Sequence, residues 1–105
     1  MKRITTVDEY NDLLKNNDIC VIKVSASWCN PCKSLALVIR GFDDETQKLF
    51  YEIDAEGADE DLLNMISVRN IPVLIFYNKG VEIKRFVGMH SGTEILDVLN
   101  DIENT

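Results

Sequence analysis

The sequence feature that most constrains this chain is a pair of cysteines between an apolar run and a helical pattern. Residues 19–24 (ICVIKV) are almost all apolar and predict a buried strand. Residues 33–40 (KSLALVIR) predict a helix. Residues 28–32 (WCNPC) stand between them, so both thiols fall where a strand ends and a helix begins. This context predicts an α/β protein with a thiol site at that junction.

The start of a helix favours the ionised form of a thiol. N–H groups of the first turn lack internal partners, the helix dipole favours negative charge there, and the thiolate is the nucleophile. Asn30 suits the N-cap and Pro31 the first helical position. The spacing brings both sulfurs onto one helical turn, close enough to bridge. We expect Cys29 to attack and Cys32 to resolve the mixed disulfide, with Trp28 shielding the pair and offering an apolar contact to a docking polypeptide.

The likeness to a known family extends well beyond this motif. Residues 28–33 (WCNPCK) after a buried strand resemble the thioredoxin family. Residues 67–72 (SVRNIP) resemble its loop with a cis-proline facing the cysteines, residues 78–80 its hairpin turn, and Val87-Gly88 its second substrate-groove loop. The resemblance covers nearly the whole chain. It implies a thioredoxin-like three-layer sandwich, in which four helices flank a central mixed β-sheet.

The order of elements along the chain agrees with such a sandwich. Hydrophobic periodicity, capping boxes and turn residues predict strands, helices and a final hairpin. The alternation of apolar and polar residues is interrupted at Arg85-Phe86, which suggests a bulge. The predicted strands are 4–5, 19–25, 49–54, 73–77 and 81–84, and the predicted helices are 7–16, 30 to the mid-40s, 59–66 and one beginning at the capping box of 91–94.

Length and composition fit one domain spanning residues 1–105. Hydrophobic residues make up 46% of the chain, enough for a packed core. The net charge of −7, from 11 basic and 18 acidic residues, argues against a nucleic-acid binder that depends on phosphate contacts. No secretory h-region or membrane span is evident, and the odd number of cysteines does not suit a disulfide-stapled secreted domain. We therefore expect a cytoplasmic monomer.

The family resemblance also implies an activity. It implies a protein dithiol–disulfide oxidoreductase that reduces target proteins through a reversible Cys29–Cys32 disulfide, with no bound cofactor and no metal. A flavin-dependent thioredoxin reductase, fed by NADPH, is the implied electron donor. The implied substrate-binding residues are Trp28, Asn30, Pro31, Ile71, Pro72, Val87, Gly88 and Met89.

Three positions depart from the family pattern. Thioredoxins usually carry a buried aspartate on the strand before the motif, but here Lys23 stands six residues before Cys29, and Phe50 stands near the position of the accompanying lysine. The acid–lysine pair is therefore not expected. Lys23 could extend its ammonium to water, could be a buried proton acceptor for Cys32, or could stabilise a thiolate and weaken the reductant. Asn30 replaces a glycine that is common in the family. Because the dipeptide between the cysteines influences the redox potential in relatives, the sequence does not fix the potential of this chain.

Other classes of function remain as alternatives. A closed zinc site needs four ligands, and beyond the motif the chain offers only Cys20 and His90. Cys20 is interpreted as a small buried apolar residue, with a regulatory or resolving thiol as the minor alternative. A thioredoxin-like binding subunit is a further alternative, and so is a disulfide isomerase or oxidant with a shifted potential. The Asn-Pro dipeptide and Trp28 favour thioredoxin over glutaredoxin.

Overall fold

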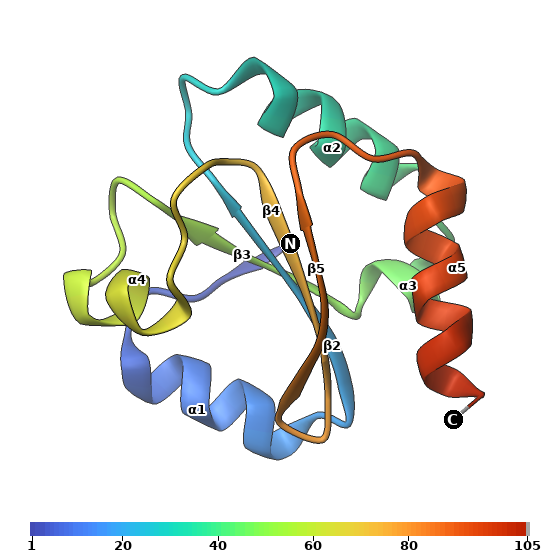
Figure 1. Ribbon diagram of the computed structural model, residues 1–105, viewed down its shortest axis with the longest axis horizontal. Coiled ribbons are helices and arrows are strands. Elements are labelled where there is room, and N and C mark those ends of the chain that lie inside the picture. The colour runs from blue at the N-terminus through green and yellow to red at the C-terminus, as the bar shows by residue number, and fades with distance from the viewer. Residues whose placement is uncertain (105) are drawn as a thin grey trace.

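The computed structural model describes residues 1–104, which form a five-stranded mixed sheet with helices on both faces (Figure 1). The strands are β1 Lys2–Arg3, β2 Ile19–Ser25, β3 Phe50–Asp54, β4 Val73–Asn78 and β5 Val81–Val87. They lie in the order β1-β3-β2-β4-β5. The first three in this order run parallel, whereas β4 is antiparallel to both β2 and β5.

Helices cover the sheet on both sides and complete three layers. The helices are α1 Val7–Asn16, α2 Asn30–Arg40, α3 Asp44–Gln47, α4 Glu60–Ile66 and α5 Gly92–Glu103. The core beneath α1 and α4 lies on one face of the sheet, and the core beneath α2 and α5 lies on the other. The predicted α/β class with a central mixed sheet is confirmed. None of the helices in residues 1–104 is long and apolar enough to cross a membrane.

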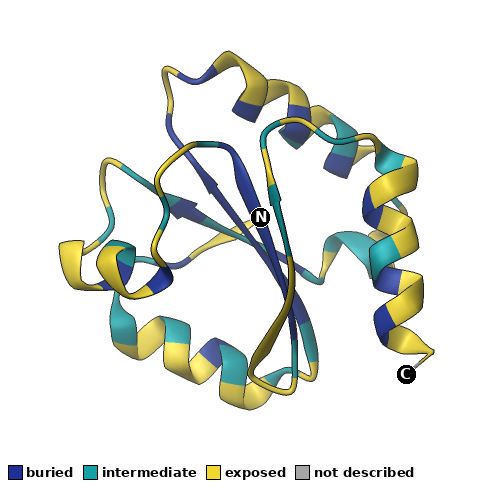
Figure 2. Cartoon of the chain, viewed as in Figure 1, coloured by how far each residue is buried: buried dark blue, intermediate teal, exposed yellow. Residues whose placement is uncertain are grey.

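The two central strands hold the cysteine loop in place. Every residue of β2 after Ile19 is buried, and so is every residue of β4 before Asn78 (Figure 2). Ile22 faces the α1/α4 core, and Val21 faces the α2/α5 core. Each fully buried Val, Ile or Phe side chain contributes about 1.5–3 kcal/mol of transfer free energy. The strand that leads to Cys29 is therefore anchored on both faces.

One helix more than predicted flanks the sheet. The predicted helix from residue 30 to the mid-40s is wrong in length, because α2 ends at Arg40 and α3 is a separate turn. Gly41 forms the C-cap of α2, and glycine is a weak helix former. Asp43 then caps α3 by accepting a hydrogen bond from the Thr46 N–H at 2.8 Å. Five helices, rather than four, therefore surround the sheet.

The first strand begins earlier than predicted. β1 consists of Lys2–Arg3, whereas the prediction placed it at Ile4-Thr5. Ile4 still donates its N–H to the Glu52 carbonyl at 2.8 Å, but its side chain is buried in the core. The chain then turns into α1, where the predicted capping box of Thr6 and Glu9 is confirmed.

The β4–β5 hairpin contains a bulge at a different place from the one predicted. Phe76 pairs with Lys84 and Tyr77 pairs with Glu82, so Ile83 is the extra residue of β5. The prediction at Arg85-Phe86 was therefore two residues too late. The predicted turn at 78–80 is confirmed, and Lys79 and Gly80 adopt φ angles of 51° and 82°. Positive φ at both positions is typical of a tight hairpin turn.

Candidate active site

Three loops meet at one end of the sheet. The register places Val24 of β2 beside Val73 of β4, and Val73 beside Val87 of β5. The loop that follows β2, the segment that precedes β4 and the segment that follows β5 therefore lie together at this end (Figure 1). The predicted cysteine motif, proline loop and glycine loop occupy these three segments, so the fold brings them into one region.

The predicted bridge between the two motif cysteines is present. Cys29 and Cys32 form a disulfide, with their Cα atoms 5.3 Å apart. Cys29 itself is the N-cap of α2, and its sulfur accepts a hydrogen bond from the Cys32 N–H at 3.2 Å. The predicted N-cap at Asn30, with Pro31 as the first helical residue, is therefore wrong by one position. Cys29 has extended φ and ψ angles, so the helix starts one residue earlier.

This capping arrangement has a direct chemical consequence. A sulfur at a helix N-terminus lies near unpaired N–H groups and the positive end of the helix dipole, which lowers the energy of a thiolate. Only 3% of Cys29 and 1% of Cys32 is exposed in the disulfide form. An attacking thiolate at Cys29 is thus electrostatically favoured, and a partner must approach closely to reach it.

The other predicted groove residues border the same end of the sheet. Ile71 and Pro72 are joined by a cis peptide bond, which confirms the isomer that the family resemblance implied. The Pro72 carbonyl accepts a hydrogen bond from the Gly88 N–H at 2.8 Å, so the proline loop and the glycine loop are tied together. Gly88 has a φ of 87°, a conformation that residues with a side chain rarely adopt.

Exposed apolar side chains surround this end of the sheet. We call Trp28, Val87 and Met89 the apolar patch. Trp28 is 67% exposed, and Val87 and Met89 are also exposed despite their apolar character. Their exposure is consistent with the predicted contact surface for a polypeptide. Asn30 and Pro31 are exposed beside the disulfide, whereas Ile71 is half-buried and Pro72 is buried.

Lys23 is buried and has a carboxylate partner that the sequence analysis missed. Its ammonium lies 3.2 Å from the Glu52 carboxylate, and its side chain is only 3% exposed. The family's own pair is not reproduced, but an exchanged one is present: β2 supplies the lysine and the paired strand β3 supplies the acid, directly opposite in the register. The ammonium reaches Glu52 rather than water. An acidic side chain within a mostly apolar strand was the signal available in the sequence.

Glu52 is held ionised by several donors. Burial raises the pKa of Glu52, but hydrogen bonds from Lys23, Arg3 and Ser25 bring that pKa below its ordinary value. The Ser25 hydroxyl donates at 3.0 Å, and the Arg3 guanidinium at 3.1 Å. Glu52 is therefore a carboxylate at neutral pH, with charge-assisted hydrogen bonds on both oxygens.

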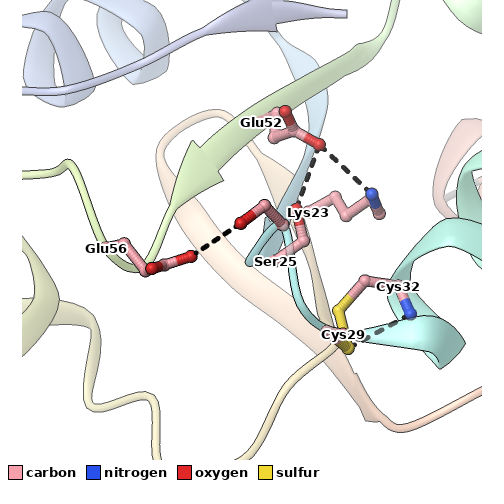
Figure 3. The surroundings of a disulfide bond; sticks show 7 residues. Lys23, Ser25, Cys29, Cys32, Glu52 and Glu56 are labelled. Carbon is pink, nitrogen blue, oxygen red and sulfur yellow. Dashed lines mark hydrogen bonds and ion pairs between the residues drawn. A yellow bond between two sulfur atoms is a disulfide. The ribbon is translucent and has the colours of Figure 1, made fainter.

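This ion pair lines a cavity that reaches Cys32. The cavity holds about 290 Å³, and Lys23, Glu52, Ser25 and Cys32 all line it. In Figure 3 the Lys23 ammonium lies between the Glu52 carboxylate and Cys32. We call this cavity the charged cavity. The disulfide therefore has an apolar, exposed region near Cys29 and a buried, ionic region near Cys32.

The remaining cysteine and the histidine lie apart from the disulfide chemistry. Cys20 is fully buried in the core, and burial raises the pKa of its thiol to about 11, so it is unreactive near neutral pH. His90 stacks on Phe86, with ring centroids 4.0 Å apart, and lies 3.1 Å from the Glu94 carboxylate. Across residues 1–104, no group of three or more His, Cys, Asp or Glu side chains is arranged to hold a metal ion.

Comparisons with known proteins agree with this geometry. The thioredoxin family profile matches residues 2–101. Thioredoxin-2 of Saccharomyces cerevisiae is 33% identical over 88 residues, covering 82% of this chain and 84% of the yeast protein. The thioredoxin of Mycoplasmoides gallisepticum is 30% identical over 100 residues, covering 94% and 99%.

Solved structures give the same result for the fold. The thioredoxin of Fasciola hepatica superposes with a TM-score of 0.84 at 24% identity, covering 96% of this chain and 98% of that chain. A mutant thioredoxin of Halobacterium salinarum gives the same TM-score at 21% identity, covering 96% and 88%. Together with the disulfide at the start of α2, the profile and the curated relatives show that this chain belongs to the thioredoxin family and is a dithiol–disulfide oxidoreductase.

Proposed function

We propose that the chain reduces disulfides of target proteins, with Cys29 as the nucleophile and Cys32 as the resolving thiol. The observation that carries this assignment is the position of Cys29 as the N-cap of α2, where its sulfur accepts the Cys32 N–H. The same helix dipole and N–H donor favour the Cys29 thiolate in the reduced protein.

The reaction follows from the two sulfurs in sequence. A target docks on the apolar patch and along Ile71-Pro72, Gly88, Asn30 and Pro31, which excludes water from the disulfide being attacked. The Cys29 thiolate attacks one target sulfur, forms a mixed disulfide and releases the other target sulfur as a thiolate. The Cys32 thiolate then attacks Cys29, which breaks the mixed disulfide and leaves the Cys29–Cys32 disulfide. Two electrons pass to the target, and its two sulfurs take up two protons.

In this proposal the charged cavity modulates the second step. The Lys23 ammonium and Cys32 line one cavity, so its positive charge favours the Cys32 thiolate. The Glu52 carboxylate opposes that effect and keeps the ammonium in place. Lys23 and Glu52 are thus positioning and electrostatic residues, and they do not touch the disulfide that is being reduced.

The proposal includes the partners and the setting of this activity. A thioredoxin reductase would return two electrons to the Cys29–Cys32 disulfide, so that the chain serves as an electron carrier. The chain would work in the cytoplasm as a single-domain monomer without a bound cofactor. The net charge of −7 supports transient encounters rather than lasting assembly.

The buried ammonium gives one observation in favour of a second candidate function. A cation that stabilises the reduced thiolate makes the reduced form more stable and the protein a weaker reductant. A disulfide isomerase or oxidant needs a reduction potential that is raised in this way. The reduction potential decides between this candidate and a general reductase.

Trapping the mixed disulfide tests the assigned roles of the cysteines. We expect the reduced Cys32→Ser variant to form a covalent adduct with a small disulfide-bonded protein, because the resolving thiol is gone. Dithiothreitol should release the adduct, and mass spectrometry should place the bond at Cys29. The Cys29→Ser variant is the matched control and should trap far less. Equal trapping by both variants would contradict the assignment.

A further inference from the structure

Two neighbouring cavities form one groove along α2 and away from the apolar patch. The charged cavity is the first, and the second holds about 460 Å³. Both are lined by Ala36 and Glu52, so they are contiguous. The groove therefore runs from Cys32, at the start of α2, to Arg40, at its end, with strands β3 and β1 as its other wall.

This groove concentrates positive charge on an acidic protein. Six of the eleven basic residues line it, but only two of the eighteen acidic residues do so. The basic residues are Lys2, Arg3, Lys23, Lys33, Arg40 and Lys48, and the acidic ones are Glu52 and Asp54. We call the whole feature the basic groove.

Part of this positive charge is not neutralised within the chain. Arg3 and Lys23 pair with Glu52, and Lys48 pairs with Glu45 at 3.3 Å in an exposed contact. Within the part of the chain that the structure describes, Lys33 and Arg40 form no ion pair. Lys2 makes no close ion pair either, but its charge helps to lower the pKa of Glu9. An exposed pair such as that of Lys48 is weak, so its ammonium can exchange partners at little cost.

The far half of the groove also has an apolar lining. Met1, which is 50% exposed, and the partly buried Tyr51 line it together with the cations, whereas Ile39 and Phe50 are almost fully buried beneath it. An apolar surface bordered by positive charge suits an occupant that carries both aliphatic and acidic side chains. The molecule measures 34 × 31 × 22 Å, whereas charges are screened over about 10 Å at 0.1 M salt. Acidic residues on distant faces therefore contribute little to the potential within the groove.

We propose that the basic groove docks an acidic, partly aliphatic segment of a redox partner protein while the partner's sulfurs engage Cys29. This inference rests on the proposed function, because the groove begins at Cys32. It assigns partner selection to a surface outside the apolar patch. Electrostatic attraction along the groove speeds the encounter and orients the partner before the apolar contacts form.

Peptide binding tests the groove independently of redox chemistry. The probe is a fluorescein-labelled ten-residue peptide of Glu, Asp and Leu, and its control has Gln and Asn in place of the acids. We expect the acidic peptide to bind oxidised wild type, to bind at least about tenfold more weakly at 0.3 M than at 0.05 M salt, and to shift backbone amide signals of groove residues. The neutral peptide should not bind.

Charge reversal supplies the matched variants. Lys2→Glu/Arg40→Glu/Lys48→Glu should weaken peptide binding about tenfold or more. Lys15→Glu/Lys79→Glu/Lys84→Glu makes the same change in net charge at exposed sites outside the groove and should stay within about twofold of wild type. The neutral triple Lys2→Gln/Arg40→Gln/Lys48→Gln should fall between them, and it guards against loss of folding in the reversed variant.

The possible failures are distinguishable. Three results would overturn the docking proposal: no peptide binding at low salt, equal loss of binding in both charge-reversal variants, or amide shifts on another face. Tighter binding of a single-stranded oligonucleotide than of the acidic peptide would also overturn it. Binding should be the same in the Cys29→Ser/Cys32→Ser variant, so a failure of the redox proposal would leave this result unchanged.

Discussion

The disulfide separates two regions of opposite character. Near Cys29, the apolar patch exposes Trp28, Val87 and Met89 to solvent. Near Cys32, the charged cavity holds a buried lysine and its partly buried carboxylate partner beside the start of α2. Apolar side chains are usually the buried ones and ions the exposed ones, so both regions reverse the usual arrangement.

The difference indicates a division of labour around one bond. Exposed apolar area gains free energy only when a partner covers it, so we propose that the patch acts in recognition. Lys23 itself offers a partner little exposed charge, but its field acts strongly on a nearby thiolate because the surroundings are poorly polarisable. Changes to the patch should therefore alter affinity, whereas changes to the cavity should alter stability and redox potential.

The largest expected effect concerns the bond that both regions share. Cys29→Ser should lower the rate of reduction of a protein disulfide by at least about 1,000-fold, because the proposed thiolate nucleophile is lost. Steady-state turnover with a small disulfide-bonded protein and dithiothreitol measures this. Cys20→Ala is the control cysteine variant and should retain turnover, since Cys20 lies in the core. Equal losses in both variants would contradict the assignment of the reaction to the Cys29–Cys32 disulfide.

Next in size is the stability effect of the charged cavity. Glu52→Gln should lower the free energy of unfolding by about 3 kcal/mol, because it leaves the buried Lys23 ammonium without its counter-charge. The double variant Lys23→Met/Glu52→Gln should recover most of that loss, since neither buried charge remains. Urea unfolding of the single and double variants measures both values.

Additive losses would contradict this account of the pair. If Lys23→Met and Glu52→Gln each destabilise the fold and their effects sum in the double variant, the two side chains act separately. The cavity would then contain two independent polar side chains rather than one ion pair.

A smaller effect is expected in the apolar patch. Trp28→Ala should raise KM for a protein disulfide about fivefold to tenfold, a loss of about 1–1.4 kcal/mol of binding free energy. The free energy of unfolding should change by less than about 0.5 kcal/mol because the side chain is 67% exposed. Leu37→Ala removes an apolar side chain of similar exposure from α2 and should leave KM unchanged.

The smallest effect is a pH dependence of stability. The pKa of Glu52 lies below its ordinary value of 4.5 in the folded state. A carboxyl of this kind stabilises the fold above its unfolded pKa, and that stabilisation is lost as the pH falls through the folded pKa. The free energy of unfolding should therefore decrease below about pH 5, and it should decrease less steeply in Glu52→Gln.

Other carboxyl groups share this acid dependence. The pKa values of Glu9, Asp43 and Glu94 are also lowered, each mainly by a hydrogen bond from a backbone N–H. The comparison with wild type therefore isolates Glu52. Identical slopes from pH 7 to pH 3 in both proteins would mean that Glu52 does not contribute.

Local sequence patterns predicted the position of the cysteines and of Trp28, whereas Val87 and Met89 came from the family resemblance. The cysteine spacing, the apolar run of β2 and the capping boxes are short-range signals, because each depends on residues a few positions apart. The relation between the cysteine motif and Pro72 came from the family resemblance. The register of the strands then explains why these segments share one end of the sheet.

The charged side of the site depended on a long-range contact. Lys23 and Glu52 are 29 positions apart, and only the parallel register of β2 and β3 sets them opposite each other. Neither residue alone predicts a partner. The break after Arg40 was missed for a different, local reason: the apolar pattern continues past Gly41, while the backbone turns there to begin α3.

The reduction potential of cavity and patch variants tests the central comparison most directly. Equilibration against a defined thiol redox buffer gives the Cys29–Cys32 potential of each protein. Lys23→Met should lower it by about 30 mV and Glu52→Gln should raise it by about 30 mV, since the two charges act oppositely on the Cys32 thiolate; Trp28→Ala should leave it nearly unchanged. An unchanged or higher potential in Lys23→Met, or a shift in Trp28→Ala as large as those of the cavity variants, would contradict the account.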